Sequence, residues 1–286
     1  MDLTNGNTLK TLLKKHGIKP KKYLGQNFLV SRIVLQQFID AADISKDDTV
    51  IEVGPGIGTI TAELAKRARK VTAVEKDPRL AEILMSASIN QNVRGRTSNI
   101  LVINEDLRKF DPKHYKLKTG GYTLVGNLPF YLTNFLIRKF LESDTPPKNM
   151  VLIIQKEVAK RICANPPRMN LLAVAVQYYG KPEIKAYVSK KSFWPEPEVD
   201  AAILRITLGG TVPPRGDCPP PVFFKIVRAG FHHPRKLLAS NLSKTLGVSK
   251  EKVGTALIQN HINPRARAEN LSVKDWTHLS RSLNVL

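Results

Sequence analysis

The sequence of 286 residues is poor in the residues that build disulfides, zinc sites and membrane spans. Its two cysteines, Cys163 and Cys218, lie far apart and form no C-x-x-C pair, and its six histidines show no metal-ligand spacing. No apolar run approaches the length of a membrane span, and the first ten residues lack the apolar core of a secretory signal. We therefore expect a cytoplasmic protein without a membrane anchor, a structural disulfide or a bound metal.

Acidic residues are also scarce relative to basic ones. Lysine and arginine total 45 against 24 aspartate and glutamate residues, which gives a formal net charge of +21. The excess is concentrated at the two ends of the chain. Residues 1–32 hold seven basic residues and one acid, and residues 209–286 hold twelve and four. Such a surface attracts a polyanion by neutralising phosphates and releasing counterions, so the charge pattern predicts a nucleic acid as partner.

The middle of the chain alternates short β-branched runs with amphipathic stretches of helical spacing, which predicts a parallel sheet with helices on both faces. The expected strands are Thr49–Val53, Val71–Glu75, Ile100–Asp106, Tyr122–Asn127 and Met150–Gln155. Helices are expected at Thr59–Arg69, from Pro78, at Thr133–Leu141 and at Glu157–Ala164. Two later runs, Glu183–Val188 and Ala201–Leu208, are predicted to pair at the edge of the sheet. The fold class is therefore α/β and Rossmann-like.

The pattern changes after residue 208. Residues 209–221 (GGTVPPRGDCPPP) have the composition of a linker. Four short amphipathic helices without strand patterns follow, at Val222–Phe231, Leu237–Leu246, Lys250–Gln259 and Val273–Leu283. We therefore predict a basic N-terminal arm at residues 1–22, an α/β domain at 23–208, a linker at 209–221 and a small all-helical domain at 222–286.

Three features at the ends of the first three strands favour an adenosyl cofactor. Gly54 and Gly56 form a tight turn in which the backbone can approach a nucleotide-like ligand. The third glycine of a dinucleotide-binding G-x-G-x-x-G motif is replaced by Thr59, which disfavours a nicotinamide cofactor. Glu75 follows about 20 residues after Gly54, where a carboxylate can accept both ribose hydroxyls. Asp106 and the amide of the next residue can contact an adenine amine and a ring nitrogen.

The segment Asn127-Leu128-Pro129-Phe130 ends the fourth predicted strand and has the groups needed to activate an adenine amine. That amine is a poor nucleophile because its lone pair is delocalised into the ring. The Asn127 side-chain oxygen and the Pro129 carbonyl can accept hydrogen bonds from it and direct its lone pair at a methyl donor. Phe130 offers a ring on which an extruded base can stack. The alternative is an ordinary strand-to-helix turn with a core phenylalanine.

As a set, these motifs resemble the ribosomal RNA adenine N6,N6-dimethyltransferase family. The segments that carry the resemblance are Tyr23–Leu29 (YLGQNFL), the glycine turn, Gly126–Phe130 (GNLPF) and Phe193–Asp200 (FWPEPEVD). They occur in the family's order between about Tyr23 and Arg205, with weaker similarity at Arg235–Lys236 and Pro264–Leu271. The resemblance therefore covers most of the chain.

The resemblance implies S-adenosylmethionine as cofactor and assigns roles to individual residues. The expected cofactor contacts are Gln26, Asn27, Leu29, Gly54, Gly56, Glu75, Lys76, Asp106, Leu107 and Asn127. The expected catalytic residues are Asn127, Leu128, Pro129, Phe130 and Phe193. Two departures from the family pattern are Phe130, where tyrosine is frequent, and the interruption of a basic run by His232-His233-Pro234.

The resemblance further implies a monomeric enzyme that methylates the N6 amine of paired adenines near the 3′ end of small-subunit rRNA, in ribosome maturation. Residues 23–208 are then the methyltransferase domain, and residues 222–286 contact RNA. The sequence leaves three alternative functions open. They are a large-subunit rRNA methylase that confers macrolide resistance, a non-catalytic nucleic-acid-binding factor on the same fold, and a dehydrogenase.

Overall fold

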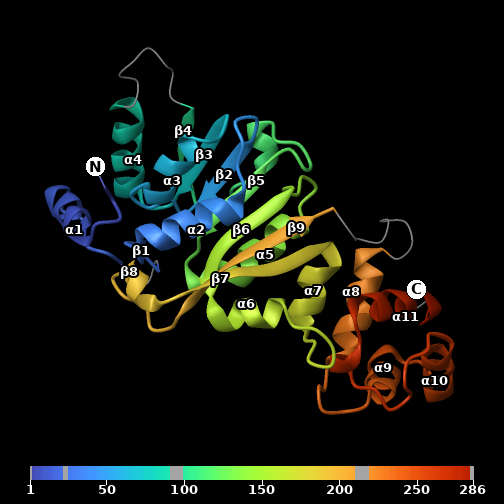
Figure 1. Cartoon of the computed structure of the whole chain (residues 1–286). Coiled ribbons are helices and arrows are strands. Elements are labelled where there is room, and N and C mark those ends of the chain that lie inside the picture. Colours follow the sequence, from blue (N-terminus) through green and yellow to red (C-terminus); the bar gives the residue numbers. More distant parts are fainter. Residues whose placement is uncertain (1, 22–24, 91–98, 210–218, 284–286) are drawn as a thin grey trace. The chain divides into compact units, whose positions relative to one another are not determined.

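The computed structural model describes residues 2–21, 25–90, 99–209 and 219–283. It consists of two compact units (Figure 1), one formed by Met1–Ala159 with Glu183–Leu208 and the other by Lys160–Pro182 with Gly209–Leu286. Residues 160–182, which lie inside the predicted 23–208 domain, thus cluster with the C-terminal helices. Within the described ranges, no helix is both long enough and apolar enough to span a bilayer.

A seven-stranded, mostly parallel sheet organises the first unit. Its strands are β2 (Thr49–Val53), β3 (Lys70–Glu75), β4 (Ile100–Asn104), β5 (Thr123–Asn127), β6 (Asn149–Gln155), β7 (Gly180–Val188) and β9 (Ala201–Leu208). They lie in the order β4-β3-β2-β5-β6-β9-β7. Chain order therefore reverses between β2 and β5, and in open α/β sheets this switch point is where ligands bind.

The central strands are largely buried because helices cover both faces of the sheet. All five residues of β2 are buried, which is typical of a parallel strand with no solvent-facing side. Figure 1 shows α2 on one side of the sheet and α5 on the other. The helices of this unit are α1 (Gly6–Lys15), α2 (Arg32–Ala42), α3 (Thr59–Ala65), α4 (Pro78–Asn90), α5 (Thr133–Leu141) and α6 (Lys156–Ile162), the last of which continues into the second unit. The predicted α/β fold is confirmed.

The two late strands pair at one edge of the sheet, as predicted. β9 runs antiparallel to β6, with Ile153 opposite Ile203, and β7 follows β9 as the edge strand. The exposed and half-buried residues of β7 alternate between its two buried ends, as expected for a strand with one open side.

The N-terminal region contains elements that the sequence patterns did not reveal. Helix α1 lies within the predicted basic arm, and its Leu9 and Leu13 are buried against Phe28, Ile57 and Leu80. The two-residue strand β1 (Phe28–Leu29) pairs with β8 (Phe193–Trp194) in a separate small sheet. Strands of two residues produce no alternation that a sequence pattern could reveal.

The second unit is helical around its own core. Its helices are α7 (Leu171–Tyr179), α8 (Pro220–Gly230), α9 (Leu238–Leu246), α10 (Lys250–Gln259) and α11 (Val273–Leu283). Tyr178 of α7 stacks on Phe223 of α8 with ring centroids 4.2 Å apart, and Trp276 of α11 is fully buried in the same core. The predicted capping box of the last helix is present, since Ser272 and Asp275 exchange side-chain-to-backbone hydrogen bonds at 2.8 and 3.2 Å.

Several predicted boundaries differ from the observed ones by one to four residues, among them the end of one strand and the end of one helix. The strand predicted at Ile100–Asp106 ends at Asn104, because the Asp106 carboxylate accepts a hydrogen bond from the Arg108 amide and starts a turn. The helix predicted to reach Arg69 ends at Ala65. Most of the predicted linker, residues 210–218, lies outside the described residues, and its last two residues already belong to α8. Short 3-10 turns complete the structure at Pro112–Tyr115 (η2), Phe130–Leu132 (η3), Lys190–Ser192 (η4) and Ala268–Asn270 (η5).

Candidate active site

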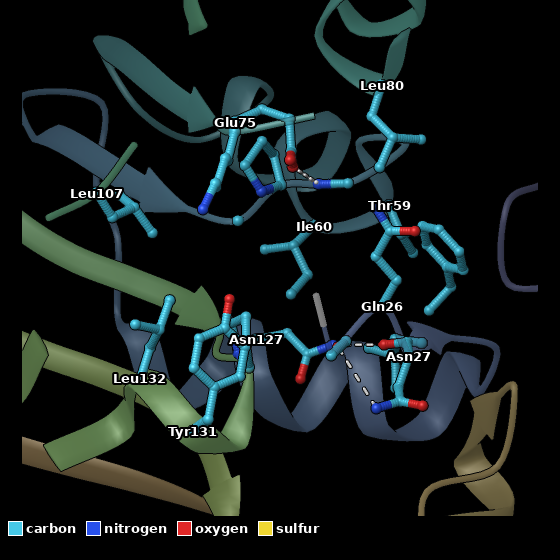
Figure 2. A pocket seen from close by; sticks show the side chains of 18 of the residues that line it. Gln26, Asn27, Thr59, Ile60, Glu75, Leu80, Leu107, Asn127, Tyr131 and Leu132 are labelled. Carbon is cyan, nitrogen blue, oxygen red and sulfur yellow. Dashed lines mark hydrogen bonds between the residues drawn. The ribbon is translucent and has the colours of Figure 1, made fainter. Parts of the chain in front are cut away.

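A pocket opens where the carboxyl ends of β2, β3 and β5 meet, at the switch point of the sheet. Its lining residues are Gly25, Gln26, Asn27, Phe28, Leu29, Gly54, Pro55, Gly56, Thr59, Ile60, Glu75, Lys76, Leu80, Asp106, Leu107, Asn127, Pro129, Tyr131 and Leu132. The pocket therefore contains all ten residues predicted to contact a cofactor. Figure 2 shows Glu75 on one side of it and Asn27 and Asn127 on the other.

The turn after β2 brings backbone rather than side chains to the pocket. Gly54 and Gly56 have φ values of +68° and +60°, a region that residues with a Cβ rarely adopt. A Cβ on Gly56 would come within 3.2 Å of the Phe28 ring. The turn is therefore specific for glycine at these positions. Its amides are already used within the protein, since Gly54 N donates to the Val74 carbonyl at 3.0 Å and Gly56 N donates to the Glu75 carboxylate.

Two hydrogen bonds orient the Glu75 carboxylate at the end of β3. Gly56 N donates to Oε2 at 3.0 Å, and Asp77 N donates to Oε1 at 2.8 Å. Burial raises the pKa of Glu75, and the neighbouring Asp77 charge acts in the same direction. Because each carboxylate oxygen has two lone pairs, both can still accept a hydroxyl of a ribose.

Glu52, on β2, is a second buried carboxyl beside this site. It is 1% exposed, and burial, with a further contribution from Glu75, raises the pKa of Glu52 to about 8. Its Oε2 atom has no hydrogen-bond partner among the described residues. The protein therefore keeps Glu52 protonated near neutral pH.

Asp106 lies in the pocket wall after β4 and already has basic partners. Arg108 contacts the carboxylate through Nη2 at 2.6 Å, and Lys76 Nζ lies 3.0 Å away. The hydrogen bonds from Arg108, against the effect of burial, hold the pKa of Asp106 far below its usual range. Any ligand amine that Asp106 binds therefore has to share the carboxylate with Arg108, whose side chain is exposed.

Asn127, the last residue of β5, lies on the same side of the pocket as the N-terminal segment and is bonded to it (Figure 2). Its Nδ2 donates to the Asn27 carbonyl at 2.8 Å (Figure 2). This bond fixes the plane of the amide, and Oδ1 is the atom that remains to accept a hydrogen bond. The Pro129 carbonyl accepts a bond from Leu132 N at 2.9 Å, so one of its lone pairs is already used.

The other predicted catalytic residues are not all brought to the pocket. Leu128 and Phe193 are buried, and Phe193 belongs to the β1–β8 pair. Phe130 is half-buried and is not part of the lining, whereas its neighbour Tyr131 lines the pocket and is 57% exposed. Of the predicted catalytic set, the pocket thus contains Asn127 and Pro129.

Several lining residues were missed by sequence reasoning. Tyr131 directly follows the Asn127–Phe130 motif, so its position could have indicated a role. The apolar residues Ile60, Leu80 and Leu132 form hydrophobic walls but have no distinctive sequence signal. The pocket combines these walls with the Glu75 carboxylate, which the Gly56 and Asp77 amides hold in place. This set of contacts suits a nucleoside, whose ring faces can pack on apolar side chains and whose sugar hydroxyls can donate to a carboxylate.

We also searched the described residues for a group of side chains that could bind a metal ion. Across residues 2–21, 25–90, 99–209 and 219–283, no three histidine, cysteine, aspartate or glutamate side chains are grouped so that they could hold a metal ion.

The chain is similar in sequence to a known protein family and to named proteins. The family model described as ribosomal RNA adenine dimethylase matches residues 17–284. A protein of Dehalococcoides mccartyi named ribosomal RNA small subunit methyltransferase A is 40% identical over 270 residues, which cover 94% of this chain and 90% of the relative. A protein of the same name from Geobacillus thermodenitrificans is 39% identical over 293 residues, covering 99% and 97%.

Two solved structures match this chain over most of its length. The crystal structure of the 23S rRNA methyltransferase ErmE has a TM-score of 0.72 and 26% identity, and the match covers 90% of this chain and all of that one. A dimethyladenosine transferase from Plasmodium falciparum also has a TM-score of 0.72, at 22% identity, covering 88% and 95%. The second of these supports the fold alone.

Proposed function

The chain belongs to the ribosomal RNA adenine dimethylase family, and we propose that it transfers methyl groups from S-adenosylmethionine to the N6 amine of adenines in small-subunit rRNA. The observation that carries the proposal is the convergence of Glu75 and Asn127 on one pocket beside a glycine turn. The small subunit is favoured because the relatives at about 40% identity bear that name, whereas the large-subunit enzyme is 26% identical.

We assign the cofactor to the half of the pocket between Gly54 and Asp106. The Glu75 carboxylate would accept the ribose hydroxyls, since Gly56 N and Asp77 N already hold it in place. Asp106 and the Leu107 amide would contact the adenine, and Ile60 and Leu80 would supply apolar walls. S-adenosylmethionine, when bound, supplies an electrophilic methyl carbon on a sulfonium.

The chain's own contribution to the reaction is to orient the target amine. Asn127 Oδ1 would accept a hydrogen bond from one N–H of the amine, because Nδ2 is held by Asn27. The backbone carbonyls of Leu128 and Pro129 are the next acceptors along the chain for the second hydrogen. Together these bonds would keep the amine lone pair pointed at the methyl carbon, and orientation of this kind can contribute a large part of a rate enhancement.

The basic surface would bind the rRNA. Phosphate contacts position an RNA without reading its sequence, so they are expected from the lysine and arginine residues at both ends of the chain. The target adenine would be extruded from its stack to reach the pocket. Two adjacent adenines, each methylated twice in the cytoplasm during maturation of the small subunit, are the substrate we propose.

The test uses small ribosomal subunits from a strain that lacks the modification, incubated with methyl-labelled cofactor. We expect label in N6-methylated adenosines near the 3′ end of the small-subunit rRNA, mapped by primer extension and mass spectrometry. Parallel incubation with large subunits tests the other rRNA. An Asn127→Ala variant is the matched control and should lose transfer. Label in large-subunit rRNA alone, or no label in either, would overturn the proposal.

A further inference from the structure

We propose that Asp77 is a positioning residue. It links Glu75, whose carboxylate is assigned to cofactor binding, to the catalytic side-chain amide of Asn127, and it does so through Gln26. The inference rests on the proposed function and assigns a role to a residue that does not line the pocket. Its basis is a path from one side of the pocket to the other, made of three hydrogen bonds and of the peptide bond that joins Gln26 to Asn27.

Asp77 is a buried carboxylate with several partners. It is 2% exposed, and it lies between β3 and the first turn of α4. Lys21 Nζ lies 3.2 Å and Arg79 Nη2 lies 3.3 Å from Oδ2. Although burial acts in the opposite direction, hydrogen bonds from Arg79, Lys21 and Gln26 lower the pKa of Asp77 to about 2. A buried carboxylate of this kind is stable only where such partners compensate its desolvation.

The backbone of Asp77 forms the first link of the path. Its amide donates to Glu75 Oε1 at 2.8 Å, and Gly56 N donates to Oε2 of the same carboxylate. The position of Asp77 therefore determines how the Glu75 carboxylate faces the pocket.

The side chain of Asp77 forms the second link, across 51 residues of sequence. Gln26 Nε2 donates to Asp77 Oδ2 at 3.2 Å, and Gln26 Oε1 accepts a bond from Lys21 N at 2.8 Å. Both ends of the Gln26 amide are thus used, so its orientation is determined. The Lys21 side chain, which contacts the same Asp77 oxygen, closes a ring of three residues.

The neighbours of Gln26 form the third link, on the other side of the pocket. The Asn27 carbonyl accepts the bond from Asn127 Nδ2 at 2.8 Å. Gly25 has a φ of +64° and lies so close to Pro129 that a Cβ built on it would be 2.8 Å from the Pro129 Cβ. Gly25, Gln26 and Asn27 are therefore held by Asp77 on one side and by the catalytic segment on the other.

The consequence is that loss of the Asp77 contact should displace the Asn127 amide without removing any group that touches substrate. A displacement of about 1 Å near the reacting atoms can lower a rate by roughly a hundredfold. This role accounts for a buried carboxylate at position 77, which is not among the residues that line the pocket.

The experiment compares Asp77→Asn, Gln26→Glu and the double variant that carries both. Asn at position 77 can still accept the hydrogen bond from Arg79 N that caps α4, so the helix start is preserved. However, the asparagine amide and Gln26 would both present donors in the first variant, and two carboxylates would face each other in the second. The double variant restores one donor and one acceptor, together with one negative charge beside Lys21.

We expect each single substitution to lower kcat for rRNA methylation about 10- to 100-fold, with KM for rRNA changed less than about threefold. The kcat of the double variant should be at least tenfold higher than that of either single variant. Asp48→Asn is the matched control. Asp48 also pairs with a lysine, Lys148, and accepts a bond from Ser45 N, but it is not in the pocket. The kcat of Asp48→Asn should stay near that of the unmodified protein, even where its melting temperature falls as much as that of Asp77→Asn.

A second measurement separates this proposal from the proposed function. Hydrogen exchange over residues 25–29 is followed with and without S-adenosylmethionine, which requires no RNA. The unmodified protein should gain protection, Asp77→Asn should gain less, and the double variant should regain it. Single variants with unchanged kcat and unchanged protection would overturn the role of Asp77, and so would a double variant no better than Asp77→Asn. If the unmodified protein methylates no rRNA, the proposed function fails and the exchange data alone decide the role of Asp77.

Discussion

At the scale of single residues, two buried glutamates near the pocket differ in whether a ligand can reach the carboxylate. Glu75 faces the pocket with lone pairs available, whereas Glu52 is enclosed and has an oxygen without a partner in the described structure. A carboxylate that points into a cavity can act on a ligand. An enclosed carboxyl affects only the stability of the fold and its dependence on pH.

Replacing Glu75 with alanine should weaken cofactor binding and leave RNA affinity nearly unchanged. The variant loses the acceptor for the ribose hydroxyls, and a hydrogen bond to a charged group contributes about 1.5–3 kcal/mol, or roughly 10- to 100-fold in affinity. Calorimetric titration with S-adenosylmethionine measures the effect, and Glu63→Ala on α3 is the control because Glu63 forms ion pairs outside the pocket. Equal affinities of the two folded variants would contradict the assignment of Glu75.

Glu52 should make the folded protein less stable as pH rises. Its pKa of about 8 in the fold lies above the model-compound value of 4.5, so between these two pH values the folded chain binds more protons than the unfolded chain. Stability then falls with pH across this window, by up to about 1.4 kcal/mol per pH unit. Denaturant unfolding of Glu52→Gln at pH 5, 6, 7 and 8 should show a flatter dependence than the unmodified protein. Parallel curves for the two proteins would mean that Glu52 does not titrate in this range.

At the scale of elements, the short turn η3 separates two adjacent aromatic residues with different surroundings. Tyr131 lines the pocket together with Leu107 and Leu132, whereas Phe130 is half-buried next to Pro129. A 3-10 turn points successive side chains about a third of a turn apart, so neighbours in sequence can serve different partners. The resemblance to the family predicts stacking on the target base for Phe130, and the geometry predicts a cofactor contact for Tyr131.

The two roles can be separated with alanine substitutions. Phe130→Ala should lower methyl transfer by the equivalent of about 1–3 kcal/mol of lost base stacking, with cofactor affinity unchanged. Tyr131→Ala should instead weaken cofactor binding. Phe130→Leu keeps most of the apolar volume without the ring, so it controls for loss of packing, and Phe130→Tyr should retain activity. A stable Phe130→Ala variant that transfers methyl groups at the normal rate would remove Phe130 from the site.

At the scale of the whole molecule, charge should dominate RNA affinity. Residues 209–286 hold twelve basic residues against four acids, and Arg265 and Arg267 among them are exposed. Each lost phosphate contact lowers the slope of log K against log salt by about 0.7–0.9. Charge reversal of both arginines to glutamate should therefore lower the slope by about 1.4–1.8 if both contact phosphates.

The matched control reverses Lys46 and Lys66, which are exposed on the first unit and change the net charge equally. Filter-binding titrations between 50 and 200 mM salt compare the variants. Equal slopes for the arginine pair and the lysine pair would show that net charge alone determines binding and that residues 265–267 make no specific phosphate contact.

The sequence by itself determined the sheet and the edge of it that carries the site. Alternation of β-branched runs with helical spacing predicts parallel strands, and parallel strands place their carboxyl ends on one edge. The residues after those strands, such as Gly54, Glu75 and Asn127, were therefore expected to meet, and they line one pocket. Local rules are sufficient for this part because strand direction and the position of a residue along a strand are encoded by periodicity.

Only the tertiary structure decided which distant segments pack together. Helix α7 lies within the predicted α/β domain by sequence position, yet Tyr178 packs on Phe223 and Phe224 in the C-terminal helical unit. Likewise, the pairing of Gln26 with Asp77 and the exposure of Tyr131 rather than Phe130 have no sequence signature. The physical reason is that such contacts depend on side-chain shape and on polar groups satisfied across 51 residues or more, whereas periodicity reports only which face of one element is apolar.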